Sequence, residues 1–171
     1  MQYLLQNGAE VDSRLDDEVS MPIHMATRYG YISIMKLLIE YGADVLAKGW
    51  NGFLPIHYAA YYKHFEAAQF LVENGGNNHS ATVGGFTPID YAVMFGSENI
   101  FRLFIKKGAI VRQDSIKMAI ENHSVEMIQP LIEYGLDVNY KDDEGKTALE
   151  CGLSKEKWNI CKSLIVESNM K

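Results

Sequence analysis

A motif that returns every 33 residues is the feature that most constrains how this chain can fold. It appears as Met21-Pro-Ile-His-Met-Ala26, Leu54-Pro-Ile-His-Tyr-Ala59 and Thr87-Pro-Ile-Asp-Tyr-Ala92, with successive alanines 33 residues apart. A fixed period of this length is the signature of repeat architectures, in which each unit buries its apolar faces against its neighbours. The sequence therefore predicts a stack of similar units.

A second motif runs in phase with the first. Proline suits the first turn of a helix, because its missing N–H would have no intrahelical partner there, so Pro22, Pro55 and Pro88 predict helix starts. A glycine that follows an apolar stripe is typical of a helix end. Each unit is expected to hold two helices and a hairpin-like loop. The closing glycines stand in Gly8-Ala-Glu, Gly42-Ala-Asp, Gly75-Gly-Asn, Gly108-Ala-Ile and Gly135-Leu-Asp.

Together the two motifs resemble those of the ankyrin repeat family over nearly all of the 171 residues. The resemblance implies an all-α solenoid of stacked helix-turn-helix units with hairpin-like loops, about five full repeats after an N-terminal half repeat. We predict a single domain, residues 1–171, with repeat units at approximately 1–14, 15–47, 48–80, 81–112, 113–140 and 141–171. A small residue recurs in each full repeat where neighbouring first helices approach, at Ala26, Ala59, Ala92, Ala119 and Gly152.

Three departures from the pattern are informative. The chain begins inside a repeat, because Tyr3, Leu4 and Leu5 belong to a second helix without its first helix. Either residues upstream were removed or the chain is a fragment of a longer protein, and we expect a missing N-terminal part to complete the repeat. The step from Ala92 to Ala119 is 27 residues, which indicates a deletion where a loop should project. Pro130 falls within the second helix of its repeat and predicts a kink or an early break. The deletion and the proline either shape a groove for a partner or reflect drift of a degenerate repeat.

Charge and hydropathy restrict the classes of partner. The net charge of −6 and the isoelectric point near 5.3 argue against a general nucleic-acid binder, which needs a basic face to attract phosphates. No apolar stretch approaches the roughly 20 residues that span a bilayer, and the N-terminus lacks the positive region of a signal peptide. We expect an intracellular, cytoplasmic chain, in the cytoplasm of the host if the source is a pathogen, with no nucleic-acid, membrane or small-molecule partner.

Chemistry-bearing motifs are missing from the sequence. It contains no phosphate-binding glycine loop, no zinc-protease motif and no nucleophile elbow. Cys151 and Cys161 lack metal-ligand spacing and are expected to be reduced, partly buried thiols. The family resemblance implies that His24 and His57 make structural hydrogen bonds. We therefore predict no enzyme activity, no catalytic residue, no metal site and no cofactor.

The resemblance also indicates which surface to examine, because ankyrin repeats usually hold partners with their loop tips and with the concave side of their first helices. Aromatic residues gather at these positions in the middle repeats, where solvent should reach them. Such side chains are typical of binding hot spots, although some of them could instead stiffen the loops by packing on one another. The predicted partner-binding residues are Arg28, Tyr29, Trp50, Asn51, Phe53, Tyr61, Tyr62, Phe86, Met94 and Phe95.

Three functional interpretations remain open. The first is a non-catalytic module that binds a protein partner through its concave, aromatic-rich face. The second is a substrate-recruiting domain of a larger enzyme or pathogen effector whose catalytic part lies elsewhere. The third, an inner segment of a long structural solenoid, is disfavoured by the mixed polarity of the last predicted helix, which contains Trp158 and Asn159 and suits a C-terminal cap. The acidic tips Asp16–Glu18 and Asp142–Glu144 either favour a partner with basic residues around an apolar anchor, or are simply solvated.

Overall fold

The computed structural model describes residues 2–13, 20–154, 161, 162 and 165. The chain divides into two compact units, Met1–Tyr91 and Ala92–Lys171, and each is described by itself. The predicted closing helix around Trp158 and the acidic tip Asp16–Glu18 lie outside the described residues. The sequence predicts that residues 1–171 form a single domain. This depends on how the two units are joined, so it stays a prediction.

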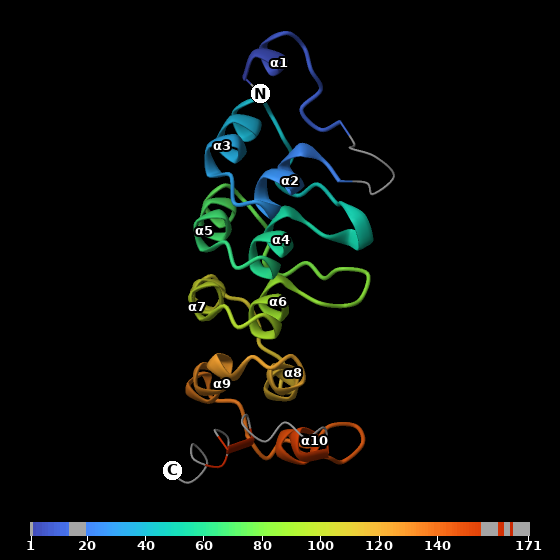
Figure 1. The fold of residues 1–171 in the computed structure, drawn as a ribbon, viewed down its shortest axis with the longest axis vertical. Coiled ribbons are helices and arrows are strands. Elements are labelled where there is room, and N and C mark those ends of the chain that lie inside the picture. The colour runs from blue at the N-terminus through green and yellow to red at the C-terminus, as the bar shows by residue number, and fades with distance from the viewer. Residues whose placement is uncertain (1, 14–19, 155–160, 163–164, 166–171) are drawn as a thin grey trace. The chain divides into compact units, whose positions relative to one another are not determined.

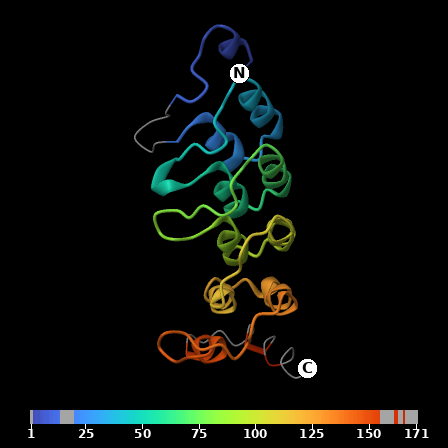
Figure 2. The ribbon, with the colours of Figure 1, turned by 180° about the vertical axis from the view of Figure 1, so that it is seen from behind.

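In the first unit, helices pair as the repeat pattern predicts. Figures 1 and 2 show α2 beside α4 in one layer and α3 beside α5 in a second, with the hairpin loops on the side of α2 and α4 that faces away from α3 and α5. The elements are α1 (Gln2–Gln6), α2 (Pro22–Arg28), α3 (Ile32–Glu40), the 3₁₀ turn η1 (Trp50–Gly52), α4 (Pro55–Tyr61), α5 (Phe65–Glu73) and the start of α6 (Pro88–Met94).

The second unit continues the alternation of first and second helices. In it α8 packs against both α9 and α10, and the ring of Phe101 on α7 meets the ring of Tyr134 on α9 edge-on at 6.3 Å. An isolated antiparallel bridge joins Lys141 to Thr147 at the base of a loop. Its elements are the end of α6, α7 (Glu98–Lys106), α8 (Ser115–Glu121), the 3₁₀ turn η2 (Val125–Met127), α9 (Ile128–Tyr134) and α10 (Ala148–Ser154).

Prolines and glycines bound the helices where the sequence predicts. Pro22, Pro55 and Pro88 are the first residues of α2, α4 and α6. After α3, Gly42 takes a left-handed backbone with φ of 89°, and the next N–H, of Ala43, donates to the carbonyl of Leu38 at 2.9 Å. This is the arrangement by which a glycine satisfies the last carbonyls of a helix. The predicted helix starts and ends are confirmed.

Small residues lie buried at the predicted positions of the first helices. Ala59, Ala92 and Ala119 have no exposed surface, and Ala26 has almost none. Gly152 on α10 has a specific reason to lack a side chain, because a Cβ there would lie 2.6 Å from Sγ of Cys161. The thiol thus occupies the space that alanine's methyl group fills in the other repeats.

The loops before the first helices repeat one backbone hydrogen bond. The N–H of Gly49 donates to the carbonyl of Phe53, that of Thr82 to Phe86, and that of Asp142 to Lys146, all at 2.8 to 2.9 Å. Each bond closes a hairpin-like turn. The connection from Gly108 to α8 is shorter than those from Gly42 to α4 and from Gly75 to α6, so the predicted deletion is confirmed.

Pro130 interrupts its second helix, as predicted, although the break falls ahead of the proline. The segment begins as η2, and the α-helix starts only at Ile128, so Pro130 is its third residue. The first four N–H groups of an α-helix have no intrahelical acceptor, and a proline there removes no hydrogen bond. The 3₁₀ turn therefore lets the chain keep a proline that a continuous helix from Val125 would not accommodate.

Apolar side chains from both layers form the core of each unit. Among the described residues, no helix is long and apolar enough to cross a membrane. Full burial of such side chains is the main term that stabilises stacked repeats. The largest fully buried residues are Ile23, Met35, Leu38, Ile56, Leu71 and Ile89 in the first unit and Ile100, Phe104, Ile116, Ile120, Met127 and Ile128 in the second.

Candidate functional site

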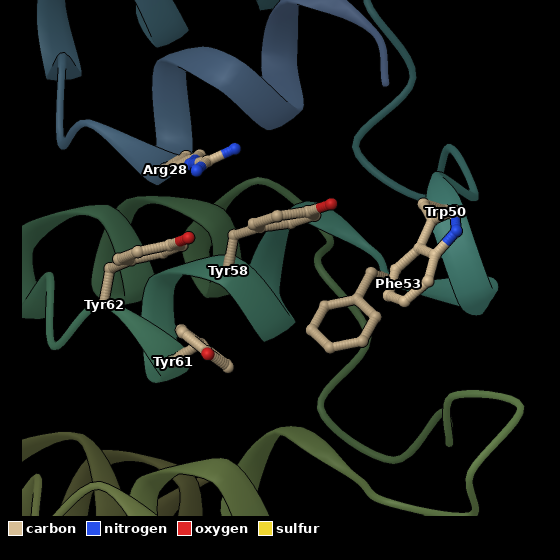
Figure 3. A pocket seen from close by; sticks show the side chains of 6 residues that line it. All are labelled: Arg28, Trp50, Phe53, Tyr58, Tyr61 and Tyr62. Carbon is tan, nitrogen blue, oxygen red and sulfur yellow. The ribbon is translucent and has the colours of Figure 1, made fainter. Parts of the chain in front are cut away.

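A hollow of about 370 Å³ opens on the first unit beside α4. We call it the aromatic hollow, because five of the six described side chains that line it are aromatic (Figure 3). The lining comes from three stretches of chain: the end of α2, the loop that contains η1, and α4 with the residue that follows it. The lining residues are Arg28, Trp50, Phe53, Tyr58, Tyr61 and Tyr62.

Helix geometry brings three tyrosines to one wall. Tyr58 and Tyr61 belong to α4 and Tyr62 follows directly, a spacing of three and four residues that puts their side chains on one helix face. The rings of Tyr58 and Tyr62 lie parallel with centroids 6.4 Å apart, and Tyr61 tilts against Tyr62 at 4.8 Å. Pairs of aromatic rings attract each other at these separations, so the three tyrosine side chains hold one another in place.

The loop before α4 supplies the opposite side of the aromatic hollow. Phe53 is half-buried because its ring contacts Tyr58 at 5.2 Å and Tyr91 at 5.1 Å. Trp50 lies on η1 with 60% of its surface exposed, and its indole makes no ring contact with a described residue. Phe53 is therefore part of the packed floor, whereas Trp50 forms an open rim (Figure 3).

A buried histidine fixes the loop that carries these two residues. His57 accepts the N–H of Leu54 at Nδ1, at 3.0 Å, and donates from Nε2 to the carbonyl of Ser80 in the next loop, at 2.9 Å. His24 does the same between Met21 and the carbonyl of Ala47. The structural role that the family resemblance implies for both histidines is confirmed.

Burial keeps both rings neutral. Desolvation lowers the pKa of His57 to about 4, against the opposing effect of its backbone hydrogen bonds, and it lowers the pKa of His24 as well. A neutral ring with one accepting and one donating nitrogen matches the hydrogen bonds that each histidine makes. With both nitrogens occupied, neither histidine is available as a base or a metal ligand.

Arg28 is the cation of the aromatic hollow. Its guanidinium lies 5.5 Å from the ring centre of Tyr62 and 5.8 Å from that of Tyr29, and it forms no ion pair with a described carboxylate. Its backbone carbonyl accepts the Nε2–H of His64 at 3.0 Å, which ties the end of α2 to the start of α5. Stacking and this tie together hold Arg28 above the tyrosines (Figure 3).

The structure groups five of the predicted residues in the aromatic hollow: Arg28, Trp50, Phe53, Tyr61 and Tyr62. Sequence reasoning missed Tyr58, although its spacing from Tyr61 and Tyr62 was a usable signal for a shared helix face. Whether these residues bind a partner stays a prediction.

Three further predicted residues lie in the first unit but do not line the aromatic hollow. Tyr29 is exposed and stacks on Tyr31 at 5.7 Å. Asn51 is exposed, and its left-handed backbone, with φ of 53°, lets its carbonyl accept the N–H of Val83. Phe86 is half-buried against Tyr91. Phe53 and Phe86 therefore follow the alternative expectation that some of the aromatic residues pack on one another.

Met94 and Phe95 belong to the second unit, where both are half-buried. The carbonyl of Met94 accepts a hydrogen bond from Oγ of Ser124. This bond is the counterpart of the one from His64 to Arg28 in the first unit, because each joins the start of a second helix to the end of the first helix of the preceding repeat. A partner-binding role for Met94 and Phe95 stays a prediction.

The described acidic tip makes its contacts within the second unit. Asp142 accepts hydrogen bonds from Nζ of Lys117 and from the backbone N–H groups of Glu144 and Lys146, and the lysine contact is the largest cause that lowers the pKa of Asp142 to about 2. Glu144 pairs with Lys146 at 2.9 Å. These carboxylates are already paired with lysines, which weakens the expectation that this tip attracts a basic partner.

The part of the chain that the structure describes contains no cluster of three or more His, Cys, Asp or Glu side chains suited to a metal ion. Cys151 and Cys161 are thiols, as predicted, and both are buried; desolvation is the largest cause that raises the pKa of each. A buried thiol with a raised pKa is a poor nucleophile. The aromatic hollow, by contrast, offers apolar surface and one cation, which suit recognition.

Paired helices at a 33-residue period, with proline at the helix starts and histidines that tie successive loops, define a helical repeat protein. The family model for ankyrin repeats in three copies matches residues 1–82 and 46–115, which together exceed half of the chain. The chain belongs to the ankyrin repeat family. Ankyrin repeats are protein-interaction modules, and domains built from them are generally non-catalytic.

Two curated proteins are similar to parts of the chain. One is the ARF GTPase-activating protein Git of Drosophila melanogaster, 40% identical over 52 residues, which are 30% of this chain and 7% of that protein. The other is the ankyrin repeat and KH domain-containing protein mask-1 of Caenorhabditis elegans, 47% identical over 47 residues, which are 28% of this chain and 2% of that protein. The similarity thus spans a small fraction of each relative.

Proposed function

We propose that this chain is a non-catalytic module of the cytoplasm that binds a protein partner through the face that carries the aromatic hollow. The observation that supports this function is the convergence of Trp50, Tyr58, Tyr61 and Tyr62 around about 370 Å³ of open space. Tyrosine, tryptophan and arginine are enriched in binding hot spots, and the two aromatic residues bury a large area at a small entropic cost because each has only two side-chain torsions.

The exposed indole of Trp50 adds to this argument. A tryptophan that is 60% exposed leaves a large apolar surface in water, and a partner that covers it gains the free energy of removing that surface from solvent. Phe53 and Tyr91 pack beneath the aromatic hollow at 5.1 Å, so the floor is already formed before a partner arrives. A preformed site loses less conformational entropy on binding.

A substrate-recruiting domain of a larger enzyme or effector is the second candidate. The similarity to a segment that makes up 7% of a GTPase-activating protein favours it, because the matching segment there belongs to a much longer chain. Both candidates use the same binding step and differ in what the rest of the polypeptide does.

Photocrosslinking tests the proposed binding face. A benzoylphenylalanine at Tyr61 is compared with one at Phe65, an exposed ring on α5 outside the aromatic hollow. We expect a protein of the source cells to be captured from position 61 and not from position 65, and capture to be lost when Trp50→Ala is added. Equal capture at both positions, or capture that survives Trp50→Ala, contradicts the proposal.

A further inference from the structure

We propose that the aromatic hollow recognises a peptide segment in which a large apolar side chain lies next to a carboxylate, with Arg28 as the group that binds the carboxylate. This inference rests on the proposed function and adds the chemistry of the partner. It follows from the charge, the stacking and the surroundings of Arg28.

The charges around the aromatic hollow favour an anion. Arg28 is the one charged group among its described lining residues, and no described carboxylate pairs with it. A guanidinium beside apolar rings is weakly screened by water, so a carboxylate that reaches it forms a charge-assisted hydrogen bond stronger than a neutral one. An acidic side chain of the partner would complete this interaction.

The ring contacts of Arg28 leave its hydrogen-bond donors available. The rings of Tyr62 and Tyr29 lie against the guanidinium at 5.5 and 5.8 Å, whereas its N–H groups point outward in the guanidinium plane. The two ring contacts restrict the positions that the group can take, which reduces the entropy lost when a carboxylate binds it. The cation is therefore preorganised for a planar anion above the tyrosine wall (Figure 3).

A cationic partner fits this site less well. Aromatic faces attract ammonium and guanidinium groups, but Arg28 already occupies the space over Tyr62, and a second cation in the aromatic hollow would meet its charge. Asp142 and Glu144 of the described acidic tip are already paired with Lys117 and Lys146. An apolar anchor with a neighbouring acid satisfies both the rings and Arg28.

The net charge of −6 makes the test more specific, because the electrostatic field of the whole chain repels an acidic peptide. Preference for the acid must then come from direct contact with Arg28. A charge-matched control is available in Lys36, an exposed lysine on α3 that does not line the aromatic hollow. Arg28→Gln and Lys36→Gln change the net charge equally, and only the first removes the proposed contact.

The test uses a library of short random peptides displayed against the full 171-residue chain. We expect the selected peptides to share an aromatic or large aliphatic residue close to Asp or Glu. Selected sequences are then synthesised with the acid and with its amide counterpart, and their dissociation constants are measured by fluorescence anisotropy. We expect the acidic peptide to bind wild type and Lys36→Gln about tenfold tighter than the amide peptide does. We expect Arg28→Gln to bind the two peptides with equal affinity.

Each outcome separates this inference from the proposed function. Peptides that require Trp50 and Tyr61, yet bind equally as acid and amide, overturn the role of Arg28 and leave the binding face intact. Peptides rich in lysine or arginine also overturn it. If no selected peptide loses affinity for the double variant Trp50→Ala/Tyr61→Ala, the proposed function fails, because the peptides then bind elsewhere on the chain. Circular dichroism of each variant checks its fold, and Arg28→Lys, which keeps the charge but not the planar fork, is expected to bind the acid with intermediate affinity.

Discussion

His57 uses both of its ring nitrogens to hold the loop of the aromatic hollow. The acceptor at Nδ1 and the donor at Nε2 require a neutral ring, and the ring has no exposed surface. Protonation would place an unpaired positive charge inside the repeat and break the bond from Leu54. The residue thus links the stability of the site to pH.

We expect acid to destabilise the chain through this residue. Unfolded His57 takes up a proton near pH 6.5, whereas the folded residue does so only near its pKa of about 4. Between these values the unfolded state binds more protons, so the free energy of unfolding falls as the pH falls. His57 alone accounts for a loss of about 3 kcal/mol on going from pH 7 to pH 4.

Urea unfolding followed by circular dichroism, at pH values from 7 to 4, measures this effect. We expect His57→Gln to lower the free energy of unfolding at pH 7 and to flatten its dependence on pH between 7 and 4. A variant His57→Gln with the same slope as wild type would refute the assignment.

Single residues show how far sequence reasoning extends to the site. The exposure of Trp50, Tyr61 and Tyr62 follows from their place in the repeat, and the sequence predicts it. The burial of Phe53 against Tyr91 does not, because those two residues meet through the packing of a loop on the next first helix. Contacts of that kind depend on tertiary geometry that a periodic pattern does not specify.

At the scale of elements, the turn between α2 and α3 positions Arg28. Gly30 has a left-handed backbone with φ of 69°, and a Cβ on it would lie 2.9 Å from Nδ1 of His64. That same histidine donates to the carbonyl of Arg28. The turn, the start of α5 and the end of α2 are therefore packed as one arrangement.

We expect Gly30→Ala to cost more stability than Gly42→Ala. Both glycines have positive φ, so both variants pay the left-handed penalty of roughly 1–2 kcal/mol. A Cβ at Gly42 meets no atom within 4 Å, whereas one at Gly30 displaces the His64 ring and weakens its hydrogen bond, for about 1 kcal/mol more. Urea midpoints of the two variants compare these costs, and equal midpoints would contradict the role of His64.

Helix boundaries were predictable because they depend on local chemistry. Proline at a helix start and glycine at a helix end act through their own backbones, so Pro55 and Gly42 could be assigned from the motif alone. Pro130 was harder to interpret: the sequence indicates an interruption, but only the structure shows that a 3₁₀ turn precedes the proline. The choice between a kink within a helix and a late helix start depends on packing with neighbouring elements.

At the scale of the whole molecule, the excess of acidic residues sets what the chain attracts. With a net charge of −6, the chain lacks the positive field that draws in phosphates. We expect no binding to a labelled DNA duplex of about 20 base pairs at about 10 µM chain and about 0.15 M salt. Fluorescence anisotropy measures it, and a salt-dependent rise in anisotropy would show a basic surface that the composition hides.

The repeat pattern of the whole chain was the most predictable feature, since each repeat packs against its neighbours through similar residue types at similar positions. Proline, alanine, histidine and glycine positions carry the scaffold, and the aromatic residues of the first unit occupy positions that the pattern leaves free. Because the repeat pattern does not specify the residue types at these positions, it does not predict which of them line the site. Their grouping depends on side-chain packing between neighbouring repeats.

The open position of Trp50 on the rim has a practical consequence. An indole in water emits at longer wavelengths than one in an apolar environment, so a ligand that covers Trp50 should shift its emission toward the blue. The chain has two tryptophans, and Trp158→Phe leaves Trp50 as the single tryptophan. The protein thus contains its own optical probe at the rim of the aromatic hollow, and titration of a ligand can be followed without attaching a dye.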